Sequence, residues 1–370
     1  MQAILAVFLI TLGVGQLSSA FLGWRAASLV GPSRLAGYSL GILLLMAGAL
    51  LLPGSSWLVL GWTLLAGPLA LALLLLAGSY IAPPPHPDCL FEAQHPAHGS
   101  CVTVQIPDGE YLIPGFLLKP PDPPHPPLQG GMLIVHGAGD TKTSFKWRLV
   151  QSLLAEGFIV LTIDLPGHGD FRHRLLAHPD CLSVIPAAIQ FLRQQPGVQQ
   201  IGLVGISLGS AMAIKSLAQN LSGLPGNQVG ALVALETPLE VRYSRGLYYG
   251  EMWNAFRAPV LSLLREVSVK QLRQSWFTGG YRSRHKNTGE VIELLNPLEN
   301  MAQLGNLPIL LVHGGRDIVA PAAAGLALQR AAPQAEFLAA KKASHVTLTL
   351  MPEVNRQVAR WLREKLEDRG

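Results

Sequence analysis

The sequence predicts an α/β fold, a mostly parallel β-sheet with helices on both faces, preceded by three transmembrane helices. Of the 28 basic and 23 acidic side chains in the 370 residues, only Arg25 and Arg34 lie before residue 88. Beyond residue 100, short apolar runs alternate with helical stretches, which is typical of parallel strands buried on both faces. One of these runs ends at a serine flanked by glycines, just before a helical stretch.

The predicted membrane region covers residues 1–82, with spans at residues 3–22, 35–52 and 57–82. These uncharged runs have 20, 18 and 26 residues. Each is long enough to cross a hydrocarbon core about 30 Å thick at about 1.5 Å per residue. The alternative for the first run is a signal peptide cleaved after Ala20, but its first residues include no Lys or Arg.

The predicted topology follows from the two arginines of this region. With three spans, the loop that holds Arg25 and Arg34 lies on the same side as the C-terminal domain. Basic loops usually face the cytoplasm, so we expect a multi-pass membrane protein with a cytoplasmic C-terminal domain. The proline-rich residues 83–99 form the expected linker to this domain, which covers residues 100–370.

The C-terminal domain contains eight candidate strands and five candidate helices. The strands are predicted at residues 101–106, 111–119, 132–137, 158–167, 201–207, 230–236, 308–314 and 336–344. The helices are predicted at residues 145–156, 182–194, 208–219, 322–331 and 352–367. Residues 239–300 interrupt the alternation with a long, helix-rich and aromatic segment, which predicts a cap inserted into the domain.

Ser207 is the candidate nucleophile. It lies in Gly205-Ile206-Ser207-Leu208-Gly209, between a predicted strand and a predicted helix. A tight strand-to-helix turn needs small residues around the serine and exposes its hydroxyl. The pentapeptide alone is weak evidence, because composition gives it roughly 0.2 times in a chain of this length. The surrounding strand and helix make Ser207 the best candidate.

A serine hydroxyl needs a base to remove its proton, and that base needs an orienting carboxylate. Asp317 follows the strand predicted at residues 308–314, and His345 follows the last predicted strand. Parallel strands bring both to the edge where Ser207 is expected. Glu236, at the end of the strand predicted at residues 230–236, is the alternative acid.

The sequence also predicts an oxyanion hole. His136-Gly137-Ala138-Gly139 follows the strand predicted at residues 132–137, and its small residues leave backbone N–H groups accessible. We expect the amides of Ala138 and Leu208 to bind the oxyanion, each contributing on the order of 3 kcal/mol in the transition state.

These motifs resemble those of a known superfamily. HGAG, DLPGHG, GISLG, GGRD and SHV begin at residues 136, 164, 205, 314 and 344. Over residues 100–367 the chain is similar to α/β-hydrolases of the serine esterase and lipase type. The resemblance implies the α/β-hydrolase fold and the triad order Ser, Asp, His. It does not identify a substrate, and the predicted membrane spans are not part of that fold.

The predicted function is cleavage of a carboxylic ester through a Ser-His-Asp triad and an acyl-enzyme. The expected partners are a small-molecule or lipid ester and the lipid bilayer. Cap residues such as Trp253 and Phe256 suggest contact with an acyl chain, although they could equally form the core of the cap. A peptidase or thioesterase would use the same triad. A catalytically silent hydrolase fold acting as a membrane scaffold is the alternative from another class.

Composition disfavours several other classes. The net charge of +5 is mild, and no basic face or nucleic-acid module is evident, so we expect no nucleic acid. The three cysteines lack metal-ligand spacing. Residues 167–180 hold several histidines and aspartates without the spacing typical of zinc sites. We expect neither a metal nor a cofactor. Transport is disfavoured because the predicted spans contain no charged side chain.

Overall fold

The computed structural model describes residues 2–22, 34–51, 61, 100–120, 130–143, 146–220, 229–242, 244–257 and 280–367. Contacts divide the chain into two compact units, residues 1–84 with 261–273, and residues 85–260 with 274–370. The predicted linker, residues 83–99, lies outside the described residues, as does the third predicted span, residues 57–82, apart from Gly61.

The described part of the first unit is a pair of helices, α1 (Gln2–Leu22) and α2 (Arg34–Leu50). Helix α2 has 17 residues and is therefore about 26 Å long, less than a hydrocarbon core of about 30 Å. Among the described residues, no helix has both the length and the apolar character needed to span a membrane. The structure thus does not support the prediction of three transmembrane helices.

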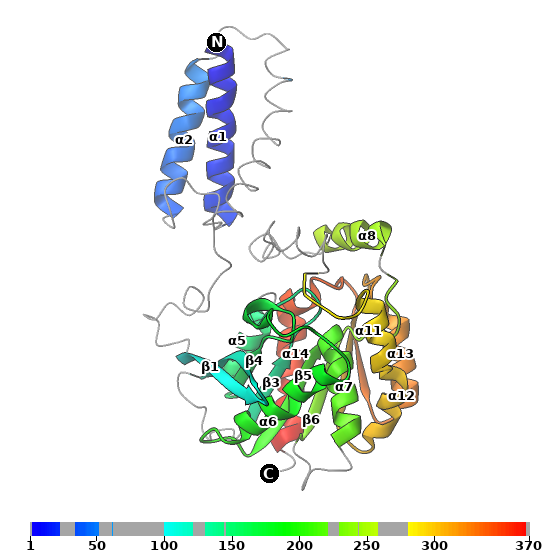
Figure 1. Ribbon diagram of the computed structural model, residues 1–370. Helices are drawn as coiled ribbons and strands as arrows, with labels where there is room; N and C mark the ends of the chain where they lie inside the picture. Colours follow the sequence, from blue (N-terminus) through cyan, green and yellow to red (C-terminus); the bar gives the residue numbers. More distant parts are fainter. Residues whose placement is uncertain are drawn as a thin grey trace. The chain divides into compact units, whose positions relative to one another are not determined.

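The second unit is built on one eight-stranded sheet with the order β1-β2-β4-β3-β5-β6-β7-β8. Strands β1 and β2 form an antiparallel edge, β2 pairs antiparallel with β4, and the remaining neighbours are parallel. This confirms the predicted mostly parallel sheet (Figure 1). The strands are β1 (Ser100–Asp108), β2 (Tyr111–Lys119), β3 (Gly130–Val135), β4 (Ile159–Ile163), β5 (Gln200–Ile206), β6 (Ala231–Leu235), β7 (Ile309–Gly314) and β8 (Glu336–Ala340).

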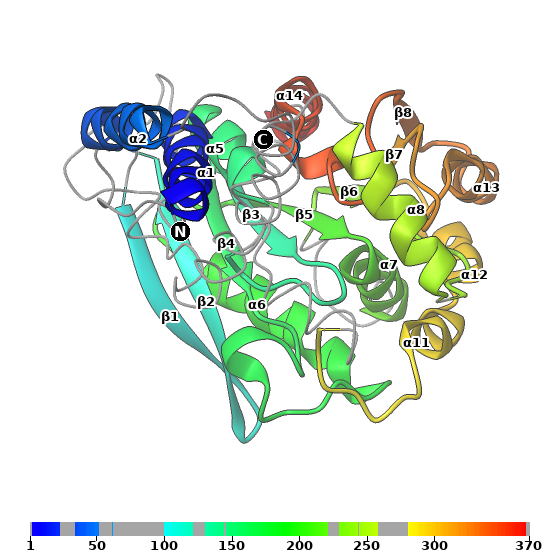
Figure 2. The same cartoon turned by 90° about the horizontal axis from the view of Figure 1, so that it is seen from above.

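Helices cover both faces of this sheet (Figure 2). One face packs against α5 (Trp147–Ala155) and α14 (Pro352–Glu367), and the other against α6 (Val184–Arg193), α7 (Leu208–Asn220) and α13 (Ala322–Ala331). Successive strand residues point to opposite faces. Met132 and Ile134 therefore join the core beside α5, while Leu133 and Val135 join the core beside α6. Burial on both faces explains why the central strands are continuously apolar.

The predicted cap segment divides between two environments. Helix α8 (Arg245–Phe256) lies beyond the carboxyl ends of the strands (Figure 1). The Ser244 hydroxyl caps it by accepting a hydrogen bond of 3.0 Å from the Leu247 amide. Helices α11 (Thr288–Leu295) and α12 (Pro297–Met301) instead pack against α7 and contribute to the main core. Residues 258–279 lie outside the described part of the chain.

Candidate active site

Ser207 occupies the turn between β5 and α7. Its φ of +52° lies in the left-handed region, which is strained for a residue other than glycine. The flanking glycines make the turn sterically feasible: a Cβ on Gly205 would lie 2.4 Å from the Cα of Ser210. A Cβ on Gly209 would lie 2.3 Å from the carbonyl oxygen of Val135. The turn therefore requires the small residues that the sequence motif predicted.

The structure brings Ser207, His345 and Asp317 into one hydrogen-bonded chain. The distance from Ser207 Oγ to His345 Nε2 is 2.9 Å, and that from His345 Nδ1 to Asp317 Oδ2 is 2.8 Å. The other carboxylate oxygen, Oδ1, accepts hydrogen bonds from the amides of Val319 (2.8 Å) and Ala320 (2.7 Å). Because an ionised carboxylate only accepts, Nδ1 of His345 donates to Asp317, which leaves Nε2 to accept from the serine hydroxyl.

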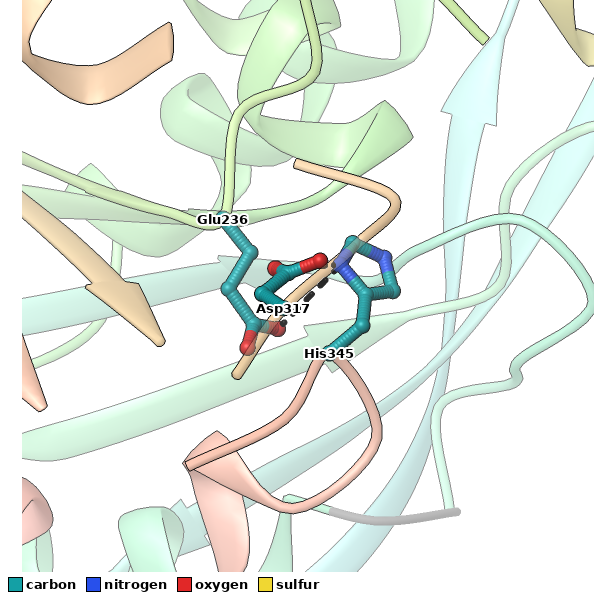
Figure 3. A group of neighbouring side chains, drawn as sticks. All are labelled: Glu236, Asp317 and His345. Atoms are coloured by element: carbon teal, nitrogen blue, oxygen red, sulfur yellow. Dashed lines mark hydrogen bonds and ion pairs between the residues drawn. The ribbon is translucent and has the colours of Figure 1, made fainter. Parts of the chain in front are cut away.

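Glu236 approaches the same imidazole from the end of β6. Figure 3 shows both carboxyl groups on the Nδ1 side of His345. The distance from Glu236 Oε2 to Nδ1 is 3.9 Å, against 2.8 Å for Asp317. Burial, followed by the negative charges of Asp317 and Glu251, raises the pKa of Glu236 well above its usual value. Glu236 is therefore a neutral neighbour, and Asp317 is the carboxyl group that hydrogen-bonds the imidazole.

The charges around His345 favour its protonated form. Burial lowers the pKa of His345, but the charge and hydrogen bond of Asp317, together with the charge of Glu251, outweigh that effect. The net pKa is raised above its ordinary value of 6.5. An imidazole of this kind readily accepts a proton from a serine hydroxyl and holds it while charge develops on the substrate.

The loop that follows β3 lies against the serine turn. Strands β3 and β5 are paired so that Val135 is opposite Gly205. A Cβ on Gly137 would lie 3.2 Å from the Cβ of Ser207. Ala138 follows Gly137 in this loop, and Leu208 is the first residue of α7. Both predicted oxyanion donors thus belong to segments that meet at Ser207, and their role stays a prediction.

An ionic network around two buried lysines, which the sequence did not predict, holds this loop in place. Lys142 Nζ lies 2.6 Å from Asp164 Oδ2 and 2.5 Å from Asp170 Oδ2. Lys146 Nζ lies 2.8 Å from Asp140 Oδ2. Both lysines are at most 5% exposed. Because 22 residues separate Lys142 from Asp164, no periodic pattern in the sequence reveals the pair.

Glu236, Asp317 and His345 also place one ligand atom each within 4.8 Å of the others, which is close enough for a cation. The hydrogen bond between Asp317 and His345 and the raised pKa of Glu236 fit a site that shares protons better than a set of metal ligands. Of the candidate ligands that the sequence offered at residues 167–180, Asp170 binds Lys142.

Comparison with known proteins supports the fold. The model of the alpha/beta hydrolase family matches residues 132–361. The solved structure of DcsB in complex with its substrate analogue is 18% identical, with a TM-score of 0.53, and the match covers 73% of this chain and 99% of that chain. Est1E from Butyrivibrio proteoclasticus with bound ferulic acid is 16% identical, with a TM-score of 0.50, and the match covers 71% and 99%. No curated protein sequence matches significantly.

The raised pKa of Glu236 predicts a pH-dependent cost to stability. Above a pH of about 4.5 the carboxyl ionises in the unfolded chain but stays protonated in the folded protein, so stability falls as pH rises. Glu236→Gln keeps the neutral shape and removes this cost. We expect its free energy of unfolding, relative to wild type, to increase between pH 4 and pH 7, by about 1.4 kcal/mol for each pH unit over which only the folded protein keeps the proton.

Denaturant unfolding at several pH values measures this difference. Glu293→Gln, on the exposed face of α11, is the matched control and should differ from wild type by a constant amount. A difference for Glu236→Gln that stays constant with pH would contradict the prediction.

Proposed function

Because this chain belongs to the alpha/beta hydrolase family, we propose that it is a serine hydrolase that cleaves carboxylic esters. The observation that carries the proposal is the hydrogen-bonded chain Ser207–His345–Asp317. A hydroxyl 2.9 Å from an imidazole nitrogen, with a buried carboxylate on the other nitrogen, is the geometry that nucleophilic acyl transfer needs.

The proposed reaction begins with attack of Ser207 Oγ on the ester carbonyl, while His345 Nε2 takes the hydroxyl proton. Asp317 stabilises the resulting imidazolium and holds the ring in the required tautomer. The amides of Ala138 and Leu208 donate to the oxyanion. His345 then gives its proton to the departing alcohol, and the C–O bond breaks to leave an acyl-enzyme.

The second half of the reaction repeats these roles with water. His345 accepts a proton from water, the hydroxide adds to the acyl carbon, and collapse of the second tetrahedral intermediate returns the proton to Ser207. The raised pKa of His345 supports this exchange, because the imidazolium must persist until the leaving group needs its proton. No step requires a group beyond these side chains, the two amides and water.

A fluorophosphonate probe tests for the activated serine. We expect wild type to be labelled, Ser207→Ala not to be labelled, and Asp317→Asn to be labelled about 10³-fold or more slowly, because the imidazole loses its orienting acceptor. The control is Ser100→Ala at the exposed start of β1, which should label like wild type. Labelling that survives in Ser207→Ala would refute the assignment. Failure to label folded wild type would favour a silent scaffold.

A series of esters with increasing acyl length tests the substrate class. Trp253 on α8 is 65% exposed, so this large apolar ring is available to a substrate. We expect kcat/KM to rise with acyl length, and Trp253→Ala to lower it about 10-fold for long chains but little for acetyl esters. Activity limited to short, soluble esters would count against a lipid substrate. Faster turnover of matched thioesters or amides would indicate a thioesterase or peptidase.

The multi-pass topology and cytoplasmic domain stay predictions of the sequence, since the structure does not support the spans on which they depended. An apolar partner for the helical pair is supported by exposed large side chains, among them Phe8 of α1 and Leu43 of α2. Protease digestion in sealed vesicles tests the topology. A cytoplasmic domain would be protected in right-side-out vesicles and digested in inverted ones. Recovery of the whole chain in the soluble fraction would overturn membrane attachment.

A further inference from the structure

Helix α8 makes a direct contact with the loop that carries His345. Glu251 lies on this helix and is only 5% exposed. Its Oε1 accepts a hydrogen bond of 3.2 Å from the amide of Val346, the residue that follows His345. The loop is also closed on itself, because the Ser344 amide donates to the Thr347 hydroxyl at 2.9 Å. The side chain of Glu251 therefore holds the compact turn at residues 344–347 against helix α8.

The same helix also contacts the loop that carries Asp317. The Asn254 side chain donates a hydrogen bond of 2.9 Å to the carbonyl oxygen of Arg316, directly before Asp317. The Arg316 guanidinium donates in return, at 3.0 Å, to the carbonyl oxygen of Arg257 just after α8. One helix of the inserted segment is thus attached to both loops whose side chains activate Ser207.

The charge of Glu251 also acts on the imidazole. The ionisable groups near His345 are Asp317 on the loop after β7, Glu236 at the end of β6, Glu251 on α8 and His313 within β7. Glu236 is held neutral, and burial lowers the pKa of His313 so that it is uncharged. Asp317 and Glu251 are therefore the two groups that raise the pKa of His345.

We infer that Glu251 is a positioning residue of the triad, through which α8 holds His345 in place beside Ser207. This inference rests on the proposed serine hydrolase activity and assigns a role in it to a helix outside the sheet. Glu251 acts on Ser207 indirectly, because it binds the Val346 amide and the neighbouring His345 contacts the serine hydroxyl. It holds the imidazole ring in line with Ser207 and adds a second negative charge to that of Asp317.

Two substitutions separate the hydrogen bond from the charge. Glu251→Gln keeps an oxygen that accepts from Val346 but removes the charge, whereas Glu251→Ala removes both. The readout is the rate of fluorophosphonate labelling between pH 5 and pH 9, which requires no known substrate. Labelling requires neutral His345, so its acidic limb reports the pKa of that group. Glu293→Gln is the matched control, because it makes the same change on the exposed face of α11.

For Glu251→Gln we expect the acidic limb to move to lower pH by about one unit, because an opposite charge that raised the pKa of His345 is gone. Its rate at pH 8 to 9 should stay within about 3-fold of wild type. Glu251→Ala should show the same shift and a rate at least about 10-fold lower. Glu293→Gln should match wild type in both. A purely structural role for Glu251 would lower rates without moving the limb.

The outcomes separate this inference from the function on which it rests. If wild type is labelled but the limb of Glu251→Gln coincides with that of wild type, the inference is overturned and the serine hydrolase stands. If folded wild type is not labelled, the proposed function itself is overturned, and the inference with it. If Glu251→Ala does not fold, as judged by circular dichroism, the limb of Glu251→Gln alone decides.

Discussion

The parallel pairing of β3 with β5 brings two turns that are 70 residues apart in the sequence to the same edge of the sheet, one after Val135 and one after Gly205. Everything else in the site is arranged around this edge. The loop after β3 can lie against Ser207 because Gly209, just after the serine, has no Cβ that would collide with the backbone of Val135 and His136. Strands β6, β7 and β8 continue the parallel order and deliver Glu236, Asp317 and His345 beside the same turn.

The charge in the site depends on three carboxyl groups, those of Asp317, Glu236 and Glu251, which differ in their hydrogen bonds and in the charges around them. Asp317 receives two backbone N–H groups and the imidazole, so its negative charge is well accommodated despite burial. Burial without a comparable set of donors, followed by the charge of Asp317, raises the pKa of Glu236 well above its usual value. Glu251 lies between these extremes, with one amide donor and the imidazole nearby, although burial raises its pKa. The charges of Asp317 and Glu251 thus support the positive charge of the imidazole, whereas Glu236 adds none.

Much of the sheet and the triad could be predicted because both are encoded locally. Continuous apolar runs mark β3 to β7. Ser207 and Asp317 follow two of these runs and His345 follows the last strand, β8, so the topology brings them together. Other features depend on contacts that leave no local signal. Glu251 meets Val346 across 95 residues, and the partners of Lys142 lie beyond a whole helix and strand. The choice of Asp317 over Glu236 also required the distances. Among the described residues the structure does not support the predicted spans. Hydropathy alone does not fix where a helix ends: α2 ends at Leu50, before the predicted end of the second span.

Glu236 and Asp317 stand at the ends of neighbouring strands, and both face Nδ1 of His345. This arrangement affects how the site can change during evolution. Loss of Asp317 would remove both the closest acceptor and one of the charges that, after burial, raise the pKa of Glu236. The pKa of Glu236 would then fall, so that its carboxylate could support the positive charge of the imidazole. A substitution of Asp317 therefore leaves a second carboxyl group facing the same nitrogen, which can take over the acid role without a change of fold.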